Sequence, residues 1–142
     1  MLPDEHDALD EVSEMPKKII STNSAPKAIG PYSQAVAVNG TLYASGQIGI
    51  NPETGELVDG LEAQARQIIK NIKAVLSEAG CSLDDVVKAT VFMIDPNGFS
   101  IVNSVMAEEF AEPFPARSCV FVSALPKGAL VEVEVVASTR CC

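Results

Sequence analysis

One stretch near the end of the chain places an arginine and two glutamates among small and apolar residues. It reads FPARSCVFVSALPKGALVEVEVVA over residues 114–137. Arg117 stays protonated at any accessible pH, and its planar guanidinium presents several donors in a geometry that matches a carboxylate or a phosphate. Pro115 stiffens the chain just before it. Arg117 therefore either binds an anionic group or lies in solvent at a strand end.

Glu132 is the second residue of this stretch with a possible chemical role. A carboxylate in a partly desolvated pocket can position and activate a water molecule. The alternative is an ordinary surface position on a strand. A shared site requires Glu132 to lie on the same face of the sheet as Arg117 and Cys119. Antiparallel pairing of the last two strands across the Pro126–Gly128 turn would permit that arrangement.

Cys119 is a candidate nucleophile, but the expected folded domain has no histidine that could deprotonate it. The single histidine, His6, lies in an acidic N-terminal segment. Cys–His and Ser–His–Asp catalysis are therefore excluded unless His6 folds back onto the domain. The four cysteines have no CxxC spacing, so neither a zinc site nor a redox dithiol is expected.

Four further positions are candidates for lining a pocket. Tyr32 lies in IGPYSQA, and it could equally be a half-buried loop aromatic. Ser45 and Gly46 end an expected strand, where a glycine lets a ligand approach the backbone closely. Asn103 interrupts an apolar helix, where it could also serve as a core or cap hydrogen-bonding group.

The composition is that of a globular chain. A length of 142 residues suits one domain, and 47% of the residues are apolar while 20% are charged. The formal net charge of −9 argues against a nucleic-acid-binding surface. Six of the nineteen acidic residues lie within the first fourteen positions, so the rest of the chain could still carry a local basic patch.

The acidic N-terminal segment defines the expected domain boundaries. Residues 1–17 lack apolar periodicity, so we expect a flexible extension, one domain over residues 18–140 and a short tail at residues 141–142. No apolar run approaches the ~20 residues of a membrane helix. The N-terminus carries acids where a signal peptide would carry a basic and an apolar segment, so we expect a cytoplasmic protein.

Apolar periodicity predicts an α+β domain with the order β-β-β-α-β-α-β-β. A spacing near 3.6 predicts a helix over 61–80 and a shorter one over 99–110. The β-branched and alternating segments predict strands at 19–22, in a hairpin over 34–46 that turns at Asn39-Gly40, and at 86–94, 117–125 and 129–139. Two helices can cover one face of such a sheet.

The last strands predict a second sheet face of mixed character. Alternation sends Val131, Val133 and Val135 to one side and Glu132 and Glu134 to the other. If the valines meet the helices, the glutamate side faces away from them. Such a face is too apolar for open water and too polar for an ordinary core, as at a subunit interface that contains a site. The residues alone therefore support a self-associating α+β protein with a small anionic-ligand site, without naming a reaction.

From about Ile19 to Ala137, the chain resembles the RidA-type members of the Rid family, the reactive-intermediate deaminases. The motifs are IGPYSQA, SGQIGINPETGE, AQARQIIKNIKAVLSEAG, KATVFMIDPNGF, FPARSC and LPKGALVEVEVVA, in this order. The resemblance implies a chorismate-mutase-like α+β fold with two helices on one sheet face. It also implies a homotrimer with a central barrel and sites in the clefts between subunits.

The same resemblance implies an activity and residue roles. The implied reaction is hydrolysis of 2-enamine and 2-imine acids, such as 2-aminoacrylate, 2-iminopropanoate and 2-iminobutanoate, to 2-oxo acids and ammonia, with no cofactor or metal. Arg117 would bind the substrate carboxylate, Glu132 would position the attacking water, and Cys119 would line the site without being an obligatory nucleophile. The matching pocket positions are Tyr32, Ser45, Gly46 and Asn103.

Two other functional classes are compatible with these residues. One is a non-catalytic binder of small carboxylic acids, because the same arginine would hold a 2-oxo acid without turnover. The other is a ribonuclease or chaperone role. The acidity of the chain disfavours RNA, and Glu132 favours an enzyme over a binder. The expected partners are thus a small-molecule substrate and further copies of the chain, with no membrane.

Overall fold

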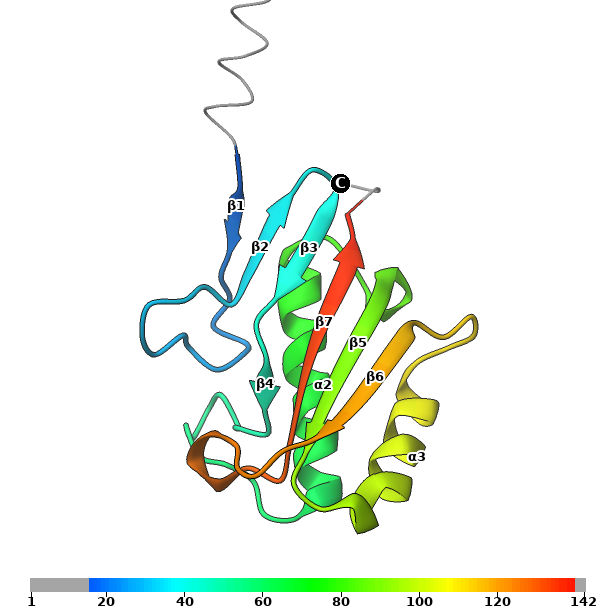
Figure 1. Ribbon diagram of the computed structural model, residues 1–142. Coiled ribbons are helices and arrows are strands. Elements are labelled where there is room, and N and C mark those ends of the chain that lie inside the picture. The colour runs from blue at the N-terminus through cyan, green and yellow to red at the C-terminus, as the bar shows by residue number, and fades with distance from the viewer. Residues whose placement is uncertain (1–15, 140–142) are drawn as a thin grey trace, which may run out of the picture.

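A seven-stranded mixed β-sheet is the framework of the computed structural model, which describes residues 16–139 (Figure 1). The strands are β1 (Lys18–Ile20), β2 (Ala35–Val38), β3 (Thr41–Ala44), β4 (Gln47–Ile48), β5 (Val86–Met93), β6 (Ala116–Phe121) and β7 (Val131–Ser138). The helices are α2 (Leu61–Glu78) and α3 (Phe99–Glu109), with 3-10 turns at Leu83–Asp85, Pro96–Gly98 and Pro126–Gly128. The predicted order of elements is confirmed, apart from the two-residue β4, which is too short to show a pattern.

The strand order shows that the last two strands are not neighbours. The sheet runs β1-β2-β3-β7-β5-β6, and β4 pairs with β7 beyond the end of β3. The connection through α3 returns β6 parallel to β5 at the sheet edge, and β7 then lies antiparallel between β3 and β5 (Figure 1). The antiparallel pairing of the last two strands, which the Pro126–Gly128 turn would have permitted, is therefore not formed.

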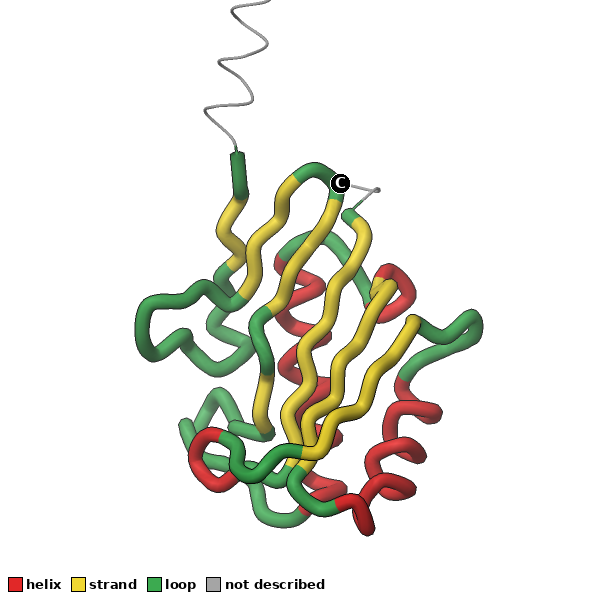
Figure 2. The backbone as a smooth tube through the Cα atoms, viewed as in Figure 1, coloured by secondary structure: helices red, strands yellow, loops and turns green. Residues whose placement is uncertain are grey.

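Both helices cover the same face of the sheet, and the core lies between them and the strands (Figure 2). Val131, Val133 and Val135 are at most 2% exposed, which confirms that they share one side of β7 and shows that this side meets the core. They meet the apolar stripe of α2, which includes Ile68 and Ile72. Each such side chain contributes about 1.5–3 kcal/mol when it leaves water, so this interface fixes the register of β7.

The predicted hairpin is confirmed in its turn geometry. Asn39 and Gly40 have φ values of 50° and 79°, and they join β2 to β3. A type I′ turn needs positive φ at both central residues, which the Asn-Gly pair provides at low cost. The strand predicted over 117–125 is shorter than expected, because regular pairing with β5 ends at Phe121.

The ends of the chain fall largely outside the described residues. The predicted flexible extension has only its last two residues in the described part, and His6 and the 141–142 tail lie beyond it. The expected domain boundaries therefore stay predictions. Within residues 16–139, no helix combines the length and the apolar character needed to cross a bilayer.

Candidate functional site

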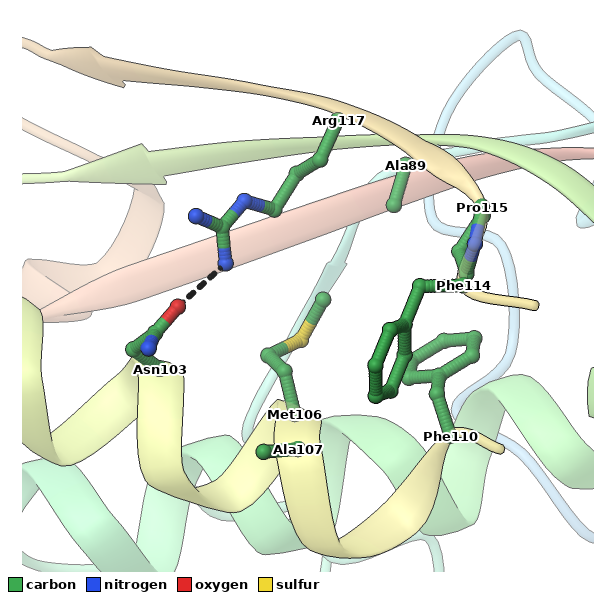
Figure 3. Close-up of a pocket in the computed structure, with 8 residues that line it drawn as sticks. All are labelled: Ala89, Asn103, Met106, Ala107, Phe110, Phe114, Pro115 and Arg117. Carbon is green, nitrogen blue, oxygen red and sulfur yellow. Dashed lines mark hydrogen bonds between the residues drawn. The ribbon is translucent and has the colours of Figure 1, made fainter. Parts of the chain in front are cut away.

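Arg117 extends from the edge strand β6 toward α3 (Figure 3). Its Nη1 donates a hydrogen bond to the Asn103 Oδ1 atom at 2.6 Å. The guanidinium carbon lies 5.4 Å from the centroid of the Phe99 ring, within the range of a cation–π contact. Within residues 16–139, no carboxylate pairs with Arg117. Its other N–H groups are oriented by α3 and are available to an anion.

A pocket of about 380 Å³ opens beside this arginine, between β6 and α3 (Figure 3). Apart from Arg117 and Asn103, its walls are apolar, and they include Met106, Phe110 and Phe114. A single cation at an apolar pocket provides one directional contact for a charged end and a surface for an organic remainder. This pocket is therefore suited to a small organic anion.

Glu132 lies on β7, where it is paired with Ile48 of β4 on one side and with Phe92 of β5 on the other. Its side chain is half-buried, and burial raises the pKa of its carboxyl, with a smaller contribution from the charge of Glu134. A Cβ added at Gly46 would overlap the Glu132 carboxylate. Any larger residue at position 46 would therefore require the Glu132 side chain to move.

The loop that carries Tyr32 is fixed by a buried amide. Gln34 is 5% exposed, and its side chain accepts the Thr22 N–H at 2.7 Å and donates to the Pro26 carbonyl at 2.8 Å. Ser45 donates its hydroxyl to the Ser33 carbonyl at 2.6 Å. The sequence analysis missed Gln34, because a glutamine in a turn-rich segment carries no distinctive pattern.

Tyr32 lies on the surface of this loop, where half of its area is exposed. Its hydroxyl accepts the Ile29 N–H at 3.3 Å. A second pocket of about 380 Å³ opens here, and Ile20, Lys27 and Tyr32 contribute to its walls. This loop is joined to the Ser45–Gly46 segment, so Tyr32, Ser45, Gly46 and Glu132 belong to one half of the candidate site.

Cys119 belongs to the other half, together with Arg117 and Asn103. Cys119 is paired with Val91 of β5, and Arg117 is paired with Ala89. Burial raises the pKa of the Cys119 thiol, and the charge of Arg117 lowers it by less. A thiol with a raised pKa is a poor nucleophile at neutral pH. This environment agrees with a lining role for Cys119.

The two halves lie on opposite faces of the sheet, so the expectation of a shared face is wrong for a single chain. Residues paired across neighbouring strands point to the same side of a sheet. Arg117 therefore shares the side of Ala89, which is buried under the helices, whereas Glu132 shares the side of Phe92. Ala89 and Phe92 are three positions apart on β5, and they point in opposite directions. The cause is the register of the two ladders on β5, which places the partners of Arg117 and Glu132 an odd number of positions apart on that strand.

Comparison with known proteins shows that this chain has close relatives in sequence and in fold. The family model described as Endoribonuclease L-PSP matches residues 22–139. A Bos taurus protein named 2-iminobutanoate/2-iminopropanoate deaminase is 51% identical over 127 residues, which are 89% of this chain and 93% of the relative. The crystal structure of RidA from an Antarctic Psychrobacter has a TM-score of 0.84 and 50% identity, covering 85% of this chain and 98% of that chain. The structure of E. coli TdcF with bound serine has a TM-score of 0.80 and 42% identity, with 85% and 98% coverage.

Proposed function

Because this chain belongs to the Endoribonuclease L-PSP family, which includes the RidA-type proteins that its motifs resemble, we propose that it hydrolyses 2-imino acids to 2-oxo acids and ammonia. The substrates would be 2-iminopropanoate, 2-iminobutanoate and their enamine tautomers. Relatives about half identical to this chain, from Bos taurus and Homo sapiens, are named deaminases of these two imines. The observation that carries the proposal is Arg117 at an apolar pocket, with no carboxylate partner among residues 16–139.

Arg117 would bind the carboxylate of the substrate. Asn103 and the Phe99 ring hold the guanidinium in place, so the Arg117 side chain loses little conformational entropy when the anion binds. A charge-assisted hydrogen bond of this kind contributes ~1.5–3 kcal/mol. TdcF was solved with serine bound, so a relative takes a ligand that carries the same carboxylate group. Cys119, beside Arg117, would line the pocket.

Glu132 would position the attacking water and accept a proton from it. The water oxygen forms a bond to C2 of the imine, and the proton passes through Glu132 to the nitrogen. The proton of the new hydroxyl then passes to the nitrogen by the same carboxyl, the C2–N bond breaks, ammonia leaves, and the C2–O bond becomes the carbonyl of the 2-oxo acid. A carboxyl with a raised pKa is a stronger base when ionised, and an imine is already electrophilic, so alignment and one base suffice.

Assembly would bring the two halves together. Arg117 and Glu132 project from opposite faces of one sheet. Each site would therefore take its arginine from one copy and its glutamate from another. The described surface supports such contacts, because Phe114, Val120 and Phe121 are each more than 40% exposed. We propose a homotrimer with a site in each cleft, in which the Tyr32 loop, Ser45 and Gly46 come with Glu132.

An imine-hydrolysis assay tests this function. An amino-acid oxidase would generate the 2-imino acid in situ, and the assay would follow the release of ammonia and 2-oxo acid above the spontaneous rate. The wild-type chain should accelerate release, and Arg117→Ala should not. Tight binding of 2-oxobutanoate without turnover would instead indicate a carboxylic-acid binder. RNA cleavage without imine hydrolysis would favour the endoribonuclease activity for which the family is named.

A further inference from the structure

Two buried amides on α2 contact the elements that enclose Glu132. The first is Gln64, which is 3% exposed. Its Oε1 accepts the N–H of Leu130 at 2.9 Å, and its Nε2 donates to the carbonyl of Val58 at 3.1 Å. Leu130 lies two residues before Glu132. Gln64 thus joins the start of β7 to Val58, whose own N–H donates to the Gly49 carbonyl at 2.9 Å.

The second amide is Asn71, which is fully buried two turns farther along α2. Its Nδ2 donates to the Ile50 carbonyl at 2.9 Å and lies 3.5 Å from the Ile48 carbonyl. Ile48 is the β4 residue paired with Glu132. Asn71 therefore holds the backbone that lies directly beside Glu132.

The backbone between these anchors lies very close to α2. A Cβ added at Gly49 would be 2.7 Å from the Gln64 Cα atom. Figure 1 shows the short β4 beside β7 with α2 behind them. The strand has only two register pairs with β7, so the ladder alone restrains it weakly. The two amides supply the missing restraint from the helix side.

We propose that Gln64 and Asn71 are positioning residues for Glu132, because they fix the Gly46–Ile50 backbone against β7 and thereby fix the orientation and hydration of the carboxylate. The proposal rests on the proposed function, since it takes Glu132 as the group that activates water. Neither amide touches the carboxylate. Each acts through the backbone segment that excludes solvent from it.

Few of the described charged residues face Glu132. The Gly46–Ile50 backbone therefore affects the Glu132 pKa mainly by controlling how much water reaches the carboxyl. Glu134 lies on the same face of β7, and β4 contributes no charged residue. On β5, Phe92 is opposite Glu132, Thr90 is opposite Glu134, and Lys88 lies farther along the same face. Burial is the larger cause of the raised Glu132 pKa. A loosened Gly46 segment would admit water and lower this pKa.

A titration of Glu132 in the full-length chain tests the proposal without relying on turnover. Carboxyl-carbon NMR would follow Glu132 in the wild type, in Gln64→Met and in Val75→Ala. Methionine keeps the length of Gln64 and removes both hydrogen bonds. Val75 is a buried residue of the same helix, and Val75→Ala creates a cavity while leaving both amides intact. It therefore controls for a loss of stability alone.

We expect the Glu132 pKa to fall by about half a unit or more in Gln64→Met and to stay unchanged in Val75→Ala. The acid limb of kcat/KM should move to lower pH by the same amount, and kcat should fall about tenfold. If Gln64→Met does not fold, Asn71→Ala removes the bonds to the Ile48 and Ile50 carbonyls and should give the same two shifts.

The proposal is overturned if the amide variants only lower the melting temperature, as Val75→Ala does, while the Glu132 titration stays at its wild-type value. Its failure is distinguishable from failure of the proposed function. If the Glu132 pKa shifts in Gln64→Met but the wild-type protein hydrolyses no imine, the positioning role is retained and the proposed reaction is rejected.

Discussion

Arg117 and Glu132 project from opposite faces of the same sheet, because their partners on β5, Ala89 and Phe92, are three positions apart. The arginine faces the α3 side and the apolar pocket. The glutamate faces the other side, against Gly46. A single chain therefore presents the proposed anion-binding group and the proposed base in separate places. Catalysis that used both would require a second copy of the chain.

Mixing two inactive variants should restore activity. Arg117→Ala lacks the carboxylate-binding group and Glu132→Gln lacks the base, so each variant alone should be inactive. In a randomly mixed trimer, about one quarter of the clefts would combine an intact arginine from one copy with an intact glutamate from the next. We expect about that fraction of wild-type activity after the two variants are unfolded and refolded together.

Each variant refolded alone serves as the control for this experiment. Light scattering should give a mass of about three chains for the wild type and for both variants. Activity that stays at background in a confirmed mixed trimer would show that one chain supplies both residues, which contradicts the opposed faces.

Arg117→Lys should lose turnover while keeping stability. Lysine retains the positive charge, but it lacks the planar pair of donors that aligns a carboxylate. We expect kcat/KM for 2-iminobutanoate to fall about 10²-fold, because misalignment of bound substrate costs rates of that order. The melting temperature should change little, since Arg117 is exposed. Normal turnover in this variant would reject alignment by the guanidinium.

Cys119→Ala should retain measurable activity. The thiol is half-buried and its pKa is raised, so it is mostly protonated at neutral pH. We expect less than about a tenfold loss of kcat/KM, which would report altered packing of the pocket wall. The same imine assay measures it beside Arg117→Lys. An inactive, folded Cys119→Ala protein would require a thiol mechanism instead.

Gln34→Met should destabilise the protein and weaken substrate binding together. Methionine cannot replace the bonds to Thr22 and Pro26, and an unsatisfied buried group costs about 1–3 kcal/mol. The freed loop carries Tyr32, so KM should rise. Urea unfolding and the imine assay measure the two effects. Val105→Ala, which truncates a buried residue of α3, controls for lost stability. An equal rise in KM in both variants would show that Gln34 does not act on substrate binding through the Tyr32 loop.

Local patterns in the sequence predicted the elements well because their causes are local. The α2 helix follows from a 3.6-residue apolar spacing, and the β2–β3 turn follows from the positive φ values that Asn39 and Gly40 adopt. The direction of the β7 valines follows from alternation. In each case the information lies within a few neighbouring residues.

The relation between Arg117 and Glu132 could not be predicted in the same way. Alternation assigns faces within one strand, but it does not say which strand lies next to it. The short link at Pro126–Gly128 favoured a hairpin, whereas the crossover through α3 placed β6 beside β5 and left β7 to fill the centre. Gln64 was missed for a similar reason, since its partners Val58 and Leu130 lie on different segments.

Glu132→Gln should stabilise the protein at neutral pH while it abolishes most of the turnover. Burial raises the Glu132 pKa in the folded state above its unfolded value, so between the two values the folded chain binds more protons. The free energy of unfolding therefore falls as pH rises through that window. The glutamine variant lacks this titration, and its advantage should be largest above the folded pKa.

Urea unfolding at one chain concentration between about pH 4 and pH 8 measures this difference, because a fixed concentration removes the effect of assembly. The gap between Glu132→Gln and wild type should close near pH 4, where the unfolded glutamate, with its usual pKa of about 4.3, also takes up a proton. Glu134→Gln is the matched control. Glu134→Gln removes only the smaller cause of the raised Glu132 pKa, so it should stabilise the protein less than Glu132→Gln does. A Glu132→Gln protein that is less stable than wild type at pH 7 would show that the folded state favours the ionised carboxylate, and the proposed base would then lose its physical basis.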